Sequence, residues 1–117
     1  MDMSKYRDLF ISEAREHIRG MNDCVLILEK DPGSDKGINE LFRHAHSVKG
    51  MSASMGYASI SELSHRLEDM MDTVRKGQIR ISQGVIDVLL AGIDNLESQV
   101  ESVENGSDPA GIDTDEI

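Results

Sequence analysis

The chain has no tryptophan and only two phenylalanines and two tyrosines, so its core must be built from Leu, Ile, Val, Met and Ala. That composition favours helix-on-helix packing over a sheet. The single cysteine, Cys24, excludes an intramolecular disulfide and a thiolate metal cluster, and we expect it to pack as a small apolar residue. No apolar run approaches the ~20 residues of a membrane span, and the first residues lack a signal peptide. We therefore expect a cytoplasmic all-α domain.

Positive charge is also scarce, because 12 basic residues face 22 acidic ones, for a net charge of −10 and a pI near 4.7. This balance argues against nucleic acid as a partner, since phosphate backbones attract the opposite sign. It argues equally against contact with an anionic membrane surface. The length of 117 residues fits one domain with one core.

Four segments repeat apolar residues at steps of three and four, as amphipathic helices do: residues 4–30, 35–55, 59–76 and 82–104. Ser4 is a candidate N-cap for the first segment. Ser59 and Glu62 have the spacing of a capping box at the start of the third. Gly56 and Gly77 stand where the second and third helices should end.

The connections between these segments are short, so consecutive helices should lie antiparallel. The prediction is an up-down-up-down four-helix bundle over residues 1–105, monomeric because its four apolar stripes can satisfy one another. Residues 106–117 are acidic and polar and can bury little, which predicts a disordered tail or the start of a flexible linker.

The candidate site centres on His46, which lies roughly 100–120° from the apolar stripe of its helix. Lys49 and Gly50 follow at i+3 and i+4 and therefore share its ridge. Gly50 costs about 1 kcal/mol relative to alanine inside a helix, so close approach by a partner or a phosphoryl group is a reason to keep it. An exposed imidazole beside a cation and open space suits phosphoryl chemistry.

Glu68 lies at the same offset on the third helix as His46 does on the second. We therefore expect the Glu68 carboxylate to accept a hydrogen bond from Nδ1–H of His46, which would fix the tautomer and leave Nε2 outward. His65, one turn before Glu68, should lie near the same groove.

Each of these residues also has an ordinary interpretation. His46, Lys49 and Glu68 are each compatible with a solvated surface position, and Gly50 with a helix–helix packing point. His44 lies about 200° around the helix from His46, so the two cannot chelate one ion. His44 is expected at the surface and His17 in a structural position. The seven methionines are expected to fill the core.

Together these residues form a recognisable pattern. The run HSVKG at 46–50 matches the H-S-[IV]-K-G motif of histidine-phosphotransfer (HPt) domains. The opening segment at 1–17, the run FRHAHSVKG at 42–50 and the pair His65-x-x-Glu68 resemble the N-terminal phosphotransfer (P1) domains of the CheA family of chemotaxis histidine kinases. The resemblance covers roughly residues 1–104.

This resemblance implies a phosphoryl carrier that is not an enzyme by itself. His46 would accept the γ-phosphoryl group of ATP through Nε2 from a CheA-type kinase core. It would then pass the group to an aspartate on a response-regulator receiver of the CheY or CheB type. Glu68 would orient and activate His46, Lys49 would offset phosphate charge, and His65 and Gly50 would be site neighbours.

The resemblance also implies that the domain binds no cofactor. ATP and Mg²⁺ would come with the kinase core, and Mg²⁺ with the receiver. The tail would begin the linker to a receiver-binding domain. At His44 many relatives carry a small residue, and we expect no mechanistic consequence from this departure.

Three alternatives remain open. The chain could be the HPt module of another phosphorelay, stand-alone or within a hybrid kinase. It could be a metal-binding bundle that uses His46, His65 and Glu68, although carboxylate-bridged bundles need several inward Glu and Glu-x-x-His pairs. It could also be a purely structural interaction module.

Overall fold

The computed structural model describes residues 3–106, and all regular secondary structure within that range is helical. The expected acidic tail at 107–117 lies outside the described residues. The helices are α1 (Met3–Lys30), α2 (Asp35–Met55), α3 (Ala58–Arg75) and α4 (Gln83–Glu104). These bounds agree with the sequence prediction to within one residue. No helix between residues 3 and 106 is both long enough and apolar enough to cross a bilayer.

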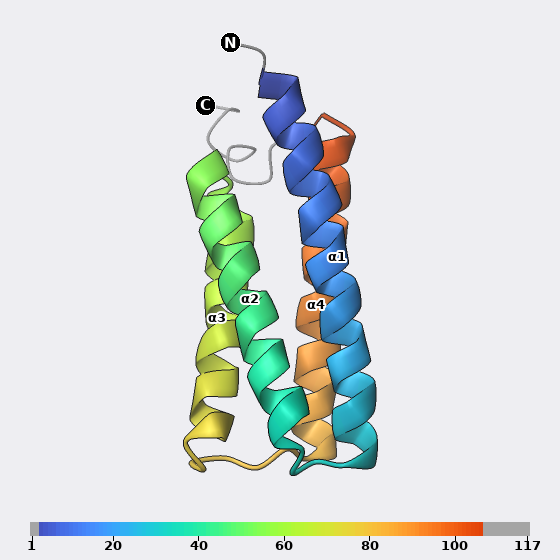
Figure 1. The fold of residues 1–117 in the computed structure, drawn as a ribbon, viewed down its shortest axis with the longest axis vertical. Helices are drawn as coiled ribbons and strands as arrows, with labels where there is room; N and C mark the ends of the chain where they lie inside the picture. Colours follow the sequence, from blue (N-terminus) through green and yellow to red (C-terminus); the bar gives the residue numbers. More distant parts are fainter. Residues whose placement is uncertain (1–2, 107–117) are drawn as a thin grey trace.

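The four helices form an antiparallel bundle in chain order (Figure 1). α1 packs on α2, α2 on α3, α3 on α4 and α4 back on α1, and the contact between α2 and α3 is the most extensive. At the end where α1 begins and α4 finishes, the Arg15 guanidinium pairs with the Glu104 carboxylate at 2.6 Å. Because α2 and α3 share the most extensive contact, they form a closely packed seam in which two side chains can be held in register.

Two of the expected helix starts are wrong. Ser4 is not an N-cap, because α1 is already helical at Met3. The capping box of Ser59 and Glu62 does not form, since α3 begins at Ala58 behind Tyr57, which offers no side-chain cap. The connection from α2 to α3 is only two residues long, so its geometry sets the start of α3 directly.

The expected helix ends are confirmed at both glycines. Gly56 has a φ of 78° and Gly77 a φ of 78°, the left-handed conformation that glycine adopts without a steric penalty. Two serines that follow turns cap helices: the Ser34 hydroxyl accepts from the Gly37 N–H at 3.1 Å, and the Ser82 hydroxyl from the Val85 N–H at 3.2 Å.

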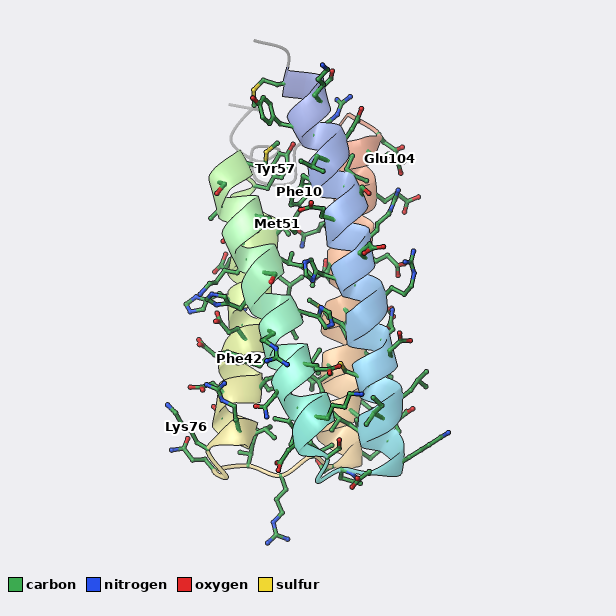
Figure 2. All side chains as sticks on the ribbon, in the orientation of Figure 1. Phe10, Phe42, Met51, Tyr57, Lys76 and Glu104 are labelled. Atoms are coloured by element: carbon green, nitrogen blue, oxygen red, sulfur yellow. The ribbon has the colours of Figure 1, made fainter. Side chains whose placement is uncertain are left out.

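The core is aliphatic, as the composition requires. Its largest fully buried side chains come from all four helices: Met21, Val25, Leu28, Leu41, Val48, Ile60, Met71, Leu89, Ile93, Leu96, Val100 and Val103. Cys24 packs among them as a small apolar residue, as expected. Phe10 and Tyr57 meet edge to face at one end of the bundle, with centroids 5.0 Å apart (Figure 2). Phe10 belongs to the core, and Tyr57 is only partly buried against it.

Some apolar predictions need correction. Met3 is 57% exposed, so the methionines are not uniformly core residues. In α4, Ile86 rather than Val85 is the buried residue of the first turn. Phe42 and Met55 are only half-buried at the margin of the α2 stripe. Such one-position differences arise because helix rotation is set by the neighbours, whereas periodicity defines only an approximate face.

One glycine contact helps to aim the third helix. An added Cβ on Gly92 of α4 would lie 2.9 Å from Cδ2 of Leu67, so the glycine allows Leu67 to pack close against α4. Glu68 follows Leu67 at about 100° around the helix. Turning Leu67 towards α4 therefore turns Glu68 towards the α2 seam.

Candidate functional site

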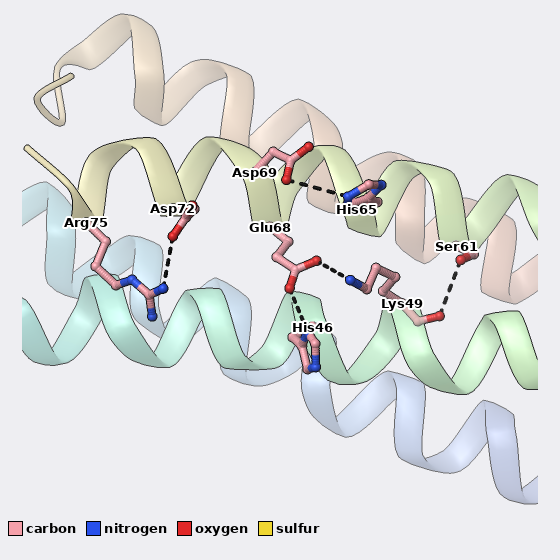
Figure 3. A network of polar contacts seen from close by, with 8 residues as sticks. All are labelled: His46, Lys49, Ser61, His65, Glu68, Asp69, Asp72 and Arg75. Atoms are coloured by element: carbon pink, nitrogen blue, oxygen red, sulfur yellow. Dashed lines mark hydrogen bonds and ion pairs between the residues drawn. The ribbon is translucent and has the colours of Figure 1, made fainter. Parts of the chain in front are cut away.

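His46 and Glu68 meet across the seam between α2 and α3 (Figure 3). The His46 Nδ1 lies 2.5 Å from Oε2 of Glu68, which is the contact that the sequence predicted. A carboxylate can only accept, so Nδ1 carries the proton and donates it. The His46 side chain is 61% exposed while that of Glu68 is 9% exposed. One nitrogen is thus held by a buried acid, and Nε2 is left as the acceptor atom of an exposed ring.

The Glu68 carboxylate is shared with Lys49. The Lys49 Nζ lies 2.7 Å from Oε1 of Glu68, which makes an ion pair. Burial acts to raise the pKa of Glu68, but the contacts with Lys49 and His46 outweigh it, so this pKa is lowered from its ordinary value of 4.5. The group at the base of the site is therefore a charged carboxylate at neutral pH.

Two serine hydroxyls bond the backbone of α2 beside this ion pair. Ser61 of α3 donates to the Lys49 carbonyl at 3.3 Å, and Ser52 donates to the same carbonyl at 3.1 Å and to that of Val48 at 2.6 Å. The Ser61 bond links α3 to α2 beyond Lys49, as Figure 3 shows. Ser61 was not predicted from the sequence, because only the helix pairing reveals which carbonyl faces it.

Gly50 faces open space. A Cβ added there would meet no atom within 4 Å, and the residue is exposed. The interpretation of Gly50 as a helix–helix packing point is therefore wrong. From Lys49 an open groove follows the two helices past Ala53 and Ser61. No neighbouring atom in the described part of the chain requires glycine at position 50. Because glycine has no side chain, the surface beside His46 stays uncovered.

His65 lines the open groove that begins at Lys49, as the sequence predicted, but it is not joined to the His46–Glu68 pair. Its Nε2 lies 3.5 Å from Oδ1 of Asp69, and the ring is 57% exposed. The three residues of the metal-site alternative therefore do not converge. Within residues 3–106 no group of three or more His, Cys, Asp or Glu side chains is arranged to hold a metal ion.

His44 is not a surface residue, which corrects the expectation. Its ring is half-buried between α1 and α2, with Nδ1 3.0 Å from Nδ1 of His17. The ring lies over Gly20, where an added Cβ would be 2.4 Å from Nε2. Burial, and then the neighbouring His17, lower the pKa of His44 from its ordinary value of 6.5. The glycine in the middle of the first helix was the sequence signal for this contact.

Comparison with known proteins places this geometry in a family. A family model described as the Hpt domain matches residues 5–99. The chain belongs to the Hpt domain family. The expectation of an HPt four-helix bundle is therefore confirmed in both sequence and fold.

Named relatives and solved structures agree with this assignment. The chain is 42% identical over 108 residues to the chemotaxis protein CheA of Bacillus subtilis, an alignment that covers 92% of this chain and 16% of that protein. The chain thus spans about a sixth of the length of this CheA relative. The CheA phosphotransferase domain of Thermotoga maritima is 35% identical with a TM-score of 0.84, over 88% of this chain and 98% of that one. The phosphorylated P1 domain of CheA3, in complex with CheY6 from R. sphaeroides, shares the fold with a TM-score of 0.84 at 22% identity, over 97% and 90%.

Proposed function

We propose that this domain is a phosphoryl carrier in a chemotaxis signalling relay, with His46 as the residue that is phosphorylated. A CheA-type kinase core supplies the phosphoryl group from ATP, and the receiver domain of a response regulator takes it. The observation that carries the proposal is the hydrogen bond from Nδ1–H of His46 to a buried carboxylate, on a ring that is otherwise exposed.

This arrangement prepares His46 as a nucleophile. With the proton held on Nδ1, the lone pair of Nε2 is free to attack the γ-phosphorus of ATP as the bond to the ADP oxygen breaks. The ring then carries a phosphoryl group on Nε2 and a proton on Nδ1 and is cationic. The Glu68 carboxylate, 2.5 Å from Nδ1, offsets that developing charge. In the second step an aspartate oxygen of the receiver attacks the phosphorus, and Nε2 leaves as neutral imidazole.

Lys49 manages charge in the same site. Its ammonium lies 2.7 Å from Glu68 and only one helical turn from His46. It lowers the cost of a buried carboxylate in the resting domain, and it stands near enough to offset the negative charge that a phosphoryl group brings. Glu68 is the orienting and activating residue, and Gly50 keeps the approach to His46 open.

Phosphoryl transfer of this kind depends on in-line positioning and on charge stabilisation, most of which a partner can supply. In this proposal ATP and Mg²⁺ arrive with the kinase core, Mg²⁺ is also held by the receiver, and the domain itself is the substrate that accepts and carries the phosphoryl group. The exposure of His46 fits two partners that must reach one nitrogen in turn. The CheY6 complex of the R. sphaeroides relative supports a response regulator as the second partner.

The test is phosphorylation with labelled ATP and a CheA kinase core that lacks its own phosphotransfer domain. The wild-type domain should acquire an acid-labile, base-stable label that a His46→Gln variant does not acquire. Adding a CheY- or CheB-type receiver should then remove the label from the domain.

Other outcomes would change the assignment. A label that persists in the His46→Gln variant would move the site to another histidine. If a folded wild-type domain stays unlabelled with this core but is labelled by a hybrid kinase, the domain belongs to another phosphorelay.

A further inference from the structure

The His46 ring also stacks with an aromatic side chain of its own helix. One turn earlier on α2, the ring of Phe42 lies nearly parallel to it, with an interplanar angle of 12° and centroids 6.3 Å apart. This separation falls within the range of offset-stacked aromatic pairs. The sequence pattern had explained Phe42 only as part of the apolar stripe, yet the side chain is half-buried and reaches the margin beside His46.

Phe42 is itself held from the opposite helix. The Arg75 guanidinium carbon of α3 lies 3.9 Å from the centroid of the Phe42 ring, which is a cation–π contact. Arg75 donates to Oδ1 of Asp72 at 2.9 Å, and Lys76 pairs with Oδ2 of the same carboxylate at 3.0 Å. Figure 3 shows Arg75 reaching from α3 towards α2, on the far side of Glu68 from Lys49. The guanidinium is therefore held over the ring through its own partner.

The two contacts of His46 restrain different motions of its ring. The hydrogen bond to Glu68 decides which nitrogen points outward, but the ring can still swing about that bond. The flat contact with Phe42 restrains the plane of the ring. Both contacts together aim the Nε2 lone pair, and in-line transfer depends on that direction.

We propose that Phe42 and Arg75 are positioning residues for phosphoryl transfer. Phe42 holds the plane of the His46 ring, and Arg75 acts through Phe42 by holding the phenyl ring in place. This inference rests on the proposed function of His46, but its geometric part can be measured on the unphosphorylated domain.

Three variants test whether the aromatic ring of Phe42, rather than its volume, and the positive charge of Arg75, rather than its aliphatic stem, are needed. Phe42→Leu keeps an apolar side chain without a ring, Phe42→Tyr keeps the ring, and Arg75→Met keeps the stem without the cation. Leu90→Ala is the control for general destabilisation, because Leu90 is half-buried on α4, which is not a direct packing neighbour of α2 among the described residues.

Two readouts are measured on each variant. The first is the chemical shift of the His46 ring protons, which the Phe42 ring current displaces. The second is phosphorylation by the kinase core, separated into kcat and KM. Phe42→Leu should move the His46 shifts towards those of a free ring and lower kcat by about three- to tenfold with little change in KM. Arg75→Met should act in the same direction with a smaller effect, and Phe42→Tyr should resemble wild type.

The inference is overturned if Phe42→Leu leaves the His46 shifts unchanged, or if its kcat equals that of the Leu90→Ala control. A Phe42→Tyr variant as slow as Phe42→Leu would also overturn it, since the ring would then not be the active feature. If the wild-type domain accepts no phosphoryl group, the proposed function fails instead, while the ring-proton shifts still decide whether Phe42 orients His46.

Discussion

His44 and His46 stand two residues apart on α2, yet they belong to different seams of the bundle. His44 turns towards α1, is half-buried over Gly20 and meets another histidine. His46 turns towards α3, is 61% exposed and meets a buried carboxylate. The same type of side chain is therefore half-buried, with a lowered pKa, in one seam and exposed, with Nδ1 on a buried carboxylate, in the other. The difference between the two histidines comes from the side chain that each contacts and from how deeply each is buried, not from the residue type.

The largest predicted difference between His46 and His44 is in phosphorylation. His46→Gln should reduce labelling by a kinase core to background, a loss of about a hundredfold or more, because the nucleophile is absent. His44→Gln should stay within about twofold of wild type, since His44 does not face the transferred group. Labelled ATP and autoradiography measure both, and circular dichroism checks that both variants are folded. Equal losses in the two variants would erase the distinction between the seams.

The second prediction concerns the carboxylate that distinguishes His46. Glu68→Gln still accepts a hydrogen bond but cannot offset the charge on a phosphorylated ring. We expect the phosphorylation rate to fall by about ten- to a hundredfold, as for loss of an acid–base partner. Asp69→Asn is the matched control, because it removes the neighbouring carboxylate, which faces His65. Similar rates for the two variants would show that Glu68 has only a structural role.

The third prediction is a two-phase loss of stability with acid. The folded domain holds the pKa of His44 below its ordinary 6.5, so the unfolded chain binds more protons below that pH and stability falls as the pH drops. Glu68 has a lowered pKa, so its contribution is present above its ordinary 4.5 and is lost as the pH falls through the folded value.

Urea unfolding between about pH 7.5 and 3.5 measures both phases. The slope from one group cannot exceed one proton, about 1.4 kcal/mol per pH unit. His44→Gln should flatten only the phase below 6.5, and Glu68→Gln only the phase below 4.5. If the free energy of unfolding of His44→Gln depends on pH as that of wild type does through the upper phase, burial of His44 is not the cause of that phase.

The smallest predicted effect compares the two glycines that lie beside these histidines. Gly50→Ala should raise the free energy of unfolding by about 0.5–1 kcal/mol, because alanine favours helix and the new Cβ meets nothing. Gly20→Ala should give no such gain, since its Cβ would lie 2.4 Å from Nε2 of His44 and force that ring away from His17. Chemical denaturation measures the pair, and an equal gain in both would contradict the close contact over Gly20.

Much of this molecule was accessible from the sequence because it is governed by local rules. The three- and four-residue apolar steps predicted four helices to within one residue of their bounds. Gly56 and Gly77 marked helix ends through a conformation that is cheap only for glycine. The two starts that failed, at Ser4 and Ser59, are cap positions, where a neighbouring turn decides which residue comes first.

Parts of the candidate site were also predictable from the sequence, and parts were not. The offsets of His46 and Glu68 from their apolar stripes were enough to predict that they face each other, because antiparallel neighbours share one groove. The place of His65 along the same groove was also predicted, but its pairing with Asp69 was not, since that pairing depends on side-chain rotation within α3. Neither was the contact of Lys49 with Glu68, because a flexible ammonium can choose among several acids.

The helix class, the order of the four helices and the outward position of His46 were predictable from the sequence alone. These follow from periodicity and from the angle between neighbouring residues on a helix. The packing of the helices decided that His44 is half-buried against His17 and that Phe42 contacts both His46 and Arg75. Those contacts depend on the axial register and rotation of one helix against the next, which are set by packing across the whole bundle.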